Sequence, residues 1–294
     1  MSEGTSTETT KIAGWLEGVV LKRIADDQLV LPSIPGVVAR SLEIVRKADF
    51  NFKDVAQVME MDPVLTARAL RLATSAAFGA GSTKLNLTEA LTRIGAKSVK
   101  TLLIEGAAQK LFISKNPQIA GASRRTWEHS IVVAGMARDI AALAGSQSGE
   151  AAYLGGLLHD VGKPLVASML LEAERQVVEV RNQKWIDTPV WVEVIARIHR
   201  KVGVALAEKW QLPDEVCRCI RDCSEYDNSD RSSIVNAVCL ANALAKQNGF
   251  AVGPIDADDV GALVMIGRSL LGLGPEMLAK LCADLKERVN GLFE

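Results

Sequence analysis

Apolar residues recur every three or four positions along almost the whole chain, from a first segment with Ile12, Trp15, Leu16 and Val19 onward. This spacing places side chains on one face of an α-helix. Outside the Gly and Pro punctuation we find no strand-like alternation over four or more residues, and no coiled-coil heptad run. The pattern predicts an all-α protein.

Pro, Gly and small polar residues divide this pattern into helices. Residues 1–10 are polar and are expected to be frayed. In the first half, Asn51 and Asp62-Pro63 open short helices, and Thr88 is expected to cap one that stops at Gly95. In the second half, the expected helices are 126–144, 150–159, 165–183, 189–210, 213–224, 231–247 and 256–292, the last broken at Gly272–Pro275.

The best internal boundary is the stretch 114–123, which holds a Pro, two small polar clusters and no periodicity. We therefore predict a two-lobed helical bundle. Its expected parts are an N-terminal tail and helix (1–28), a first lobe (29–120), a second lobe (121–248) and a C-terminal helical extension (249–294), which we expect to cap the second lobe or to form a dimer contact.

Charge and cysteine content argue against several classes of protein. The chain has 34 Lys+Arg against 35 Asp+Glu, a net charge of -1, whereas nucleic-acid binding needs a clustered basic excess. Five cysteines make no disulfide framework and indicate a reducing compartment. No apolar run approaches a membrane span of about 18 residues, and the N-terminus is unlike a secretion signal. We expect a cytoplasmic protein without nucleic-acid or membrane partners.

The chain has only three histidines, His129, His159 and His199, and His159 is followed directly by Asp160. This pair lies at the end of an apolar helix, before a Gly-containing break that leaves side chains free to converge. Neutral imidazoles with a carboxylate are ligands suited to Zn, Fe or Mn. A cluster of cysteines, Cys217, Cys219 and Cys223, lacks the paired spacing of a zinc site, and we interpret these as buried or free thiols.

The spacing resembles the HD superfamily of metal-dependent phosphohydrolases. The resemblance implies that His129, His159, Asp160 and His199 correspond to a metal site and that Lys163 matches the lysine after the His-Asp pair, which would be catalytic in an active enzyme. The pattern then departs from the family. Asp222-Cys223 stands where a His-His pair is typical, and Asn242 stands where the distal metal Asp belongs. The site is therefore degenerate and has one carboxylate, unless Asp222 restores a second.

The first lobe resembles the HDOD family, a group of HD-related output domains of bacterial signalling proteins. The resemblance rests on LPSIPGVV at 31–38, on DPVLT at 62–66 and on the helix around Ile94-Gly95, and it spans roughly residues 29–245. It implies a regulatory scaffold, commonly without enzymatic competence. Retention of the His-Asp pair is the unusual feature.

From this resemblance we expect a non-enzymatic signalling module that binds a protein partner in trans. Candidate partners are a histidine kinase, a response regulator or a cyclic-dinucleotide enzyme. No cofactor is expected, and oligomers are left open. The alternative is a mononuclear metal-dependent phosphohydrolase that uses Fe, Mn or Zn. It would act on a cyclic dinucleotide, a nucleotide or a phosphomonoester. A third hypothesis is a small-ligand sensor in which Lys163 and His129 face an anion.

Overall fold

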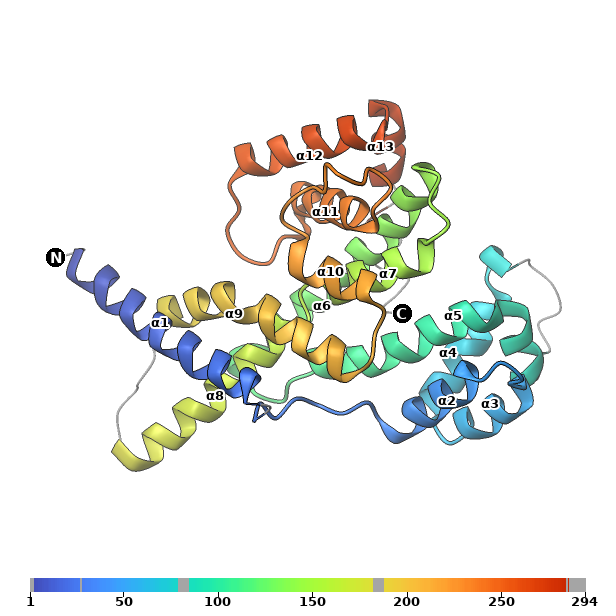
Figure 1. Cartoon of the computed structure of the whole chain (residues 1–294), viewed down its shortest axis with the longest axis horizontal. Coiled ribbons are helices and arrows are strands. Elements are labelled where there is room, and N and C mark those ends of the chain that lie inside the picture. The colour runs from blue at the N-terminus through green and yellow to red at the C-terminus, as the bar shows by residue number, and fades with distance from the viewer. Residues whose placement is uncertain (1–2, 27, 79–84, 182–187, 284, 286–294) are drawn as a thin grey trace. The chain divides into compact units, whose positions relative to one another are not determined.

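The computed structural model describes residues 3–26, 28–78, 85–181, 188–283 and 285. Every regular element in these ranges is helical, which confirms the all-α prediction (Figure 1). The chain divides into two compact units. Residues 33–110 form the smaller unit, and residues 1–32 with 111–294 form the larger one.

Among its described residues, the smaller unit has four α-helices, which follow one another along the chain, and a short 3-10 helix (Ala76–Phe78). The α-helices are α2 (Gly36–Arg46), α3 (Phe52–Met59), α4 (Pro63–Thr74) and α5 (Leu87–Gln109). As expected, the Asn51 and Asp62 side chains accept hydrogen bonds from the first turns of α3 and α4. These caps define where each helix of the unit starts.

Helix α5 corrects one predicted cap and confirms one predicted break. Asn86, and not Thr88, caps α5, because Asn86 and Glu89 form a reciprocal capping box. The polar residue followed three positions later by Glu is the signature of this motif. Gly95 interrupts the helix as predicted, with a φ of 78° that favours glycine.

The larger unit holds the remaining helices. They are α1 (Glu3–Ala25), α6 (Pro117–Leu143), α7 (Gly149–Leu158), α8 (Gly162–Arg181), α9 (Thr188–Lys209), α10 (Asp214–Asp222), α11 (Ile234–Ala245), α12 (Ala257–Leu271) and α13 (Pro275–Ala283). Helix α1 lies along α9 (Figure 1).

Two predicted boundaries in this unit are wrong. Helix α1 already begins at Glu3, within the stretch expected to be frayed. Helix α6 begins at Pro117, inside the boundary stretch 114–123, whereas we expected this helix to begin at residue 126. The Asn116 side chain accepts from the amide of Gln118, and Pro117 occupies the first helical position, where a missing N–H costs nothing. Residues 286–292 of the last expected helix lie outside the described residues.

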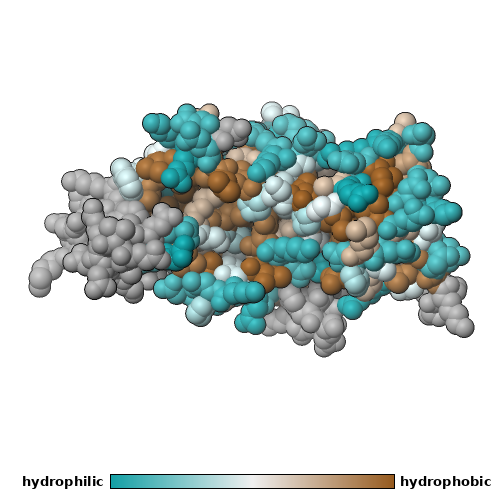
Figure 2. All heavy atoms as spheres, turned by 90° about the horizontal axis from the view of Figure 1, so that it is seen from below, coloured by the Kyte–Doolittle hydropathy of each residue, from teal (hydrophilic) through white to brown (hydrophobic). Residues whose placement is uncertain are grey.

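Apolar side chains reach the surface between hydrophilic ones on the face that Figure 2 shows. In the smaller unit, Met61 and Val64 are exposed at the junction of α3 and α4. In the larger unit, Met265 and Ile266 are exposed on α12. Scattered exposed apolar residues are normal, so these side chains alone assign no interface.

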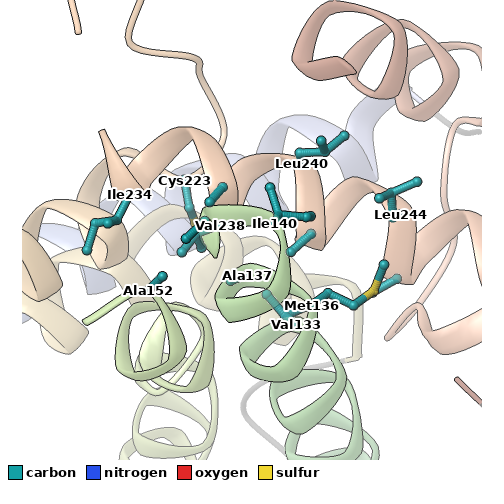
Figure 3. Close-up of a cluster of buried hydrophobic side chains, with 14 of the residues drawn as sticks. Val133, Met136, Ala137, Ile140, Ala152, Cys223, Ile234, Val238, Leu240 and Leu244 are labelled. Carbon is teal, nitrogen blue, oxygen red and sulfur yellow. The ribbon is translucent and has the colours of Figure 1, made fainter. Parts of the chain in front are cut away.

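Helix α11 is the centre of the larger unit, since all of its residues are buried. A helix that is apolar on every side must be surrounded by other elements. Helix α11 packs on α6, α7, α10 and α12. Figure 3 shows Val133 and Ile140 of α6 beside Val238 and Leu244 of α11 in this core.

The C-terminal extension packs onto the same core. Leu273 and Leu278 are buried in it, and the Tyr226 hydroxyl donates to the carbonyl oxygen of Leu263 at 2.7 Å. The predicted break is confirmed, because Gly272 ends α12 with a φ of 67°. Within the described residues, no helix alone has the length and hydropathy to cross a membrane; α12 and α13 reach these values only as a pair bent by 117°.

Candidate metal centre

Three side chains of the predicted site converge inside the larger unit. His129 lies within α6, and His159 and Asp160 lie in the turn between α7 and α8. The Nε2 atoms of the two histidines are 3.2 Å apart, and they lie 3.9 Å (His129) and 3.3 Å (His159) from Oδ2 of Asp160. One ligand atom from each of the three residues lies within 4.8 Å of the others.

Two glycines allow the helices to approach closely enough for this convergence. A Cβ atom on Gly156 would lie 2.8 Å from the Cα atom of Ala134, so α7 packs directly on the backbone of α6. A Cβ atom on Gly162 would lie only 1.7 Å from the carbonyl oxygen of His199. The turn that carries Asp160 is therefore held against α9.

The third histidine and the lysine face the same carboxylate. His199 Nε2 lies 3.6 Å from Oδ1 of Asp160, on the opposite oxygen from the other two histidines. The Lys163 ammonium donates to Oδ2 of Asp160 at 2.6 Å. The structure thus brings His129, His159, Asp160, His199 and Lys163 around one carboxyl group.

All three histidines present the same ring nitrogen to the cluster. Their Nδ1 atoms lie close to the carbonyl oxygens of Phe250 (2.8 Å), Gly156 (2.6 Å) and Ile195 (2.8 Å). A carbonyl oxygen can only accept, so each Nδ1 carries the proton. In a neutral ring Nε2 is then the lone-pair atom, the tautomer that metal-binding histidines adopt when a carbonyl group orients them.

Burial sets the charge states of the cluster. Burial lowers the pKa of His129 to about 3, and it also lowers the pKa of His199, so both rings are neutral near pH 7. Burial alone would raise the pKa of Asp160, but the adjacent His159 and Lys163 outweigh it and hold that pKa well below its usual range. The centre has one carboxylate, surrounded by three imidazole rings and the Lys163 ammonium.

The donor set fits a divalent transition metal. Acceptor nitrogens and a carboxylate that face one another repel unless a proton or a cation lies among them. Neutral imidazole and carboxylate ligands suit Zn, Fe and Mn. His129, His159 and Asp160 would hold such an ion, with His199 on the other carboxylate oxygen.

Neither Asp222 nor Asn242 supplies a second carboxylate ligand. Asp222 is 43% exposed, and its carboxylate accepts from Nε of Arg221 at 3.1 Å. Asn242, on α11, is buried, and its Oδ1 atom has no hydrogen-bond partner among the described residues. The amide oxygen is a weaker ligand than the carboxylate typical of the HD pattern, so the centre is short of negative charge.

The cluster is closed to solvent. His129, His159 and Asp160 are 2%, 1% and 5% exposed, and His199 is 7% exposed. A catalytic metal needs an open coordination position that substrate and water can reach. Lys163, with a 29% exposed side chain, is the member of the cluster that extends toward the surface.

Two neighbours of the centre carried no sequence signal. Phe250 is the last residue of the π-helical turn Lys246–Phe250, and no side-chain pattern predicts the contact of its carbonyl oxygen with His129, 121 positions away. The Lys246 ammonium lies near enough to interact with Asp160, and burial lowers its pKa.

The cysteines form no metal site in the part of the chain that the structure describes. Cys217, Cys219 and Cys223 are buried on or directly after α10, and the group of possible metal ligands does not include them. Burial raises the pKa of Cys223 to about 11, so its thiol is protonated. This agrees with their interpretation as buried thiols.

Solved structures that share this fold carry two different descriptions, metal-dependent phosphohydrolase and signal transduction protein. A crystal structure from Shewanella amazonensis, provisionally assigned as a metal-dependent phosphohydrolase, superposes with a TM-score of 0.76 at 23% identity and covers 96% of this chain and 99% of its own. A provisionally assigned signal transduction protein from Marinobacter aquaeolei gives 0.63 at 24%, covering 92% of this chain and 60% of its own. These likenesses establish the fold alone.

Sequence comparison identifies the family. An uncharacterized protein of Treponema pallidum is 26% identical over 217 residues, which are 73% of this chain but 40% of that relative. The chain thus spans well under half the length of this relative. The family model of the HDOD domain matches residues 31–226, most of the chain. The chain therefore belongs to the HDOD family.

Proposed function

We propose that this chain is a non-enzymatic regulatory module of bacterial signalling that acts by binding a protein partner. The observation that carries the proposal is the closed, charge-poor centre. Its ligand side chains are at least nine-tenths buried, and it has one carboxylate. By the sequence resemblance, Asn242 stands where the second carboxylate is expected. Family membership supports the same conclusion, since HDOD domains are regarded as output modules.

A closed, charge-poor centre is unsuited to phosphohydrolase turnover. A phosphohydrolase must bring a phosphoryl group and a water to the metal, and it must hold a dication with enough negative charge to polarise that water. Here the imidazoles point inward, and a lysine neutralises the carboxylate. The near-zero net charge also offers no long-range attraction for polyanionic substrates.

An activity assay with an engineered control tests the proposal. The full chain is incubated with Mn, Fe or Zn and with cyclic dinucleotides, nucleotides and a chromogenic phosphomonoester. We expect no turnover above that of the His159→Ala variant. Metal-dependent turnover that His159→Ala abolishes would refute the proposal.

A binding experiment tests the partner class. Candidate histidine kinases, response regulators and cyclic-dinucleotide enzymes from the same genome are purified, and their affinity for the chain is measured by calorimetry. We expect saturable binding of one of them. Failure of every candidate to bind, together with measurable turnover, would favour the alternative function.

The alternative, a mononuclear metal-dependent phosphohydrolase, is supported by the orientation of the three Nε2 atoms toward Asp160. A bound dication would polarise a phosphoryl oxygen and lower the pKa of a water. Metal analysis of protein purified without chelator tests this candidate. It requires stoichiometric metal that both His129→Ala and Asp160→Ala lose, together with turnover.

A further inference from the structure

One carboxylate oxygen of the centre faces both an ammonium group and two imidazole rings. Oδ2 of Asp160 accepts from the Lys163 ammonium at 2.6 Å. The same atom faces the Nε2 atoms of His159 at 3.3 Å and of His129 at 3.9 Å. It is therefore both the anchor of an internal ion pair and the oxygen nearest the two inward-facing imidazoles.

The ammonium and a metal ion would compete for this oxygen. A transition metal bound by carboxylate and imidazole lies about 2.0–2.2 Å from its ligand atoms. An ammonium on the same oxygen would then be only a few ångströms from a dication. The Asp160 side chain is 7% exposed, and repulsion between cations is screened weakly at such a buried position. Binding of one cation therefore weakens the binding of the other.

Of the side chains within 4 Å of the Asp160 carboxylate, Lys163 is the one that is free to leave. It lies in the first turn of α8, its side chain is 29% exposed, and its stem of four methylene groups is flexible. The histidines are buried, and their Nδ1 atoms are held by backbone carbonyl groups. Metal entry would therefore move the lysine and leave the imidazoles in place.

We propose that Lys163 is the built-in counter-ion of Asp160, and that its ammonium and a divalent transition metal exchange at this carboxylate. With metal bound, the ammonium moves from the interior to the surface. The surface charge beside the α7–α8 turn then depends on metal occupancy. The proposal goes beyond the proposed function and holds with or without turnover.

The first test is a metal titration of the full chain, freed of metal by chelator and then dialysed. Calorimetry with Co²⁺, Mn²⁺ and Zn²⁺ compares wild type with Lys163→Met, which removes the ammonium and keeps the aliphatic stem. Because wild type must break a charge-assisted hydrogen bond to bind metal, we expect Lys163→Met to bind about tenfold more tightly or better. Asp160→Asn should lose binding.

The matched control is Lys201→Met on α9. Lys201 has a 52% exposed side chain and pairs with Glu17 of α1 at 3.2 Å, away from Asp160. This variant should bind metal as wild type does. Equal or weaker metal binding by Lys163→Met than by Lys201→Met would overturn the proposal, as would the absence of metal binding in all variants.

The second test uses wild type alone and does not depend on whether a variant folds. A brief pulse of acetic anhydride, followed by peptide mass spectrometry, measures the reactivity of each lysine. Lys163 should react slowly without metal and several-fold faster at saturating metal, while Lys201 should not change. An unchanged rate for Lys163 at saturation would overturn the exchange even if the metal binds.

Discussion

The substitution Gly162→Ala tests the contact that positions the candidate centre. The new Cβ atom would lie 1.7 Å from the carbonyl oxygen of His199 and 2.5 Å from its carbonyl carbon. Both atoms are backbone within a helix, so no side-chain rotation relieves the clash, and α8 must move away from α9. Overpacked cores lose about 1–3 kcal/mol even where side chains can yield.

Gly162 is the first residue of α8, so the interior helix propensity of alanine, about 1 kcal/mol better than that of glycine, offsets little of this loss. Since the clash is between backbones, we expect the upper end of the overpacking range and a net loss of about 2 kcal/mol or more in the free energy of unfolding. The movement should also separate His199 from Asp160 and weaken any metal binding.

Urea unfolding monitored by circular dichroism measures the change, and Gly135→Ala is the matched control. Gly135 lies within α6, and a Cβ atom there meets nothing within 4 Å. That variant should be more stable than wild type, by about 0.5–1 kcal/mol. If Gly162→Ala unfolds within about 0.5 kcal/mol of wild type, the close α8–α9 contact is not a feature of the folded protein.

Acid should destabilise the chain. Burial lowers the pKa of His129 to about 3, so below about pH 6.5 the unfolded chain binds a proton there that the folded chain does not. This residue alone should reduce stability by about 1.4 kcal/mol per pH unit down to about pH 4. His199, whose pKa is also lowered, adds to the effect, and His129→Gln should make a plot of urea midpoints against pH less steep. Asn236→Ala should cost about 2–3 kcal/mol in thermal melts, because the buried amide bonds to both Asp227 and Asp230, whereas an unchanged Tm would contradict this role. Of the five thiols, Ellman's reagent should react rapidly with Cys282 alone in the folded protein and with all five in urea.

The histidine cluster was predictable from sequence because the informative residues are few. Three histidines and a His-Asp pair before a glycine break leave little choice of ligands, and family resemblance aligns them. The orientation of each ring was not predictable, because it depends on backbone carbonyl groups such as that of Phe250. The ion pair of Lys163 with Asp160 depends on side-chain geometry at their separation of three positions, which spacing alone permits but does not require.

Helix content followed from periodicity, whereas helix ends depended on single capping residues. The break at Gly95 and the end of α12 at Gly272 were predictable, since glycine adopts positive φ without strain. The start of α6 was missed because small polar residues after Pro117 have the composition of a loop. Tertiary packing overrides such weak local preferences, and α6 buries its apolar positions against α7 and α11.

The charge balance of the centre explains why its burial is compatible with a stable fold. A carboxylate at position 242 would be a second buried charge on α11, which is buried along its whole length, and an unpaired buried charge costs far more than an amide. Asn242 avoids that cost, although its Oδ1 atom is left without a partner. Lys163 meanwhile neutralises the one remaining carboxylate, Asp160. With an amide at position 242 and the Asp160 carboxylate paired internally, the core of this unit needs no dication to balance its buried charge.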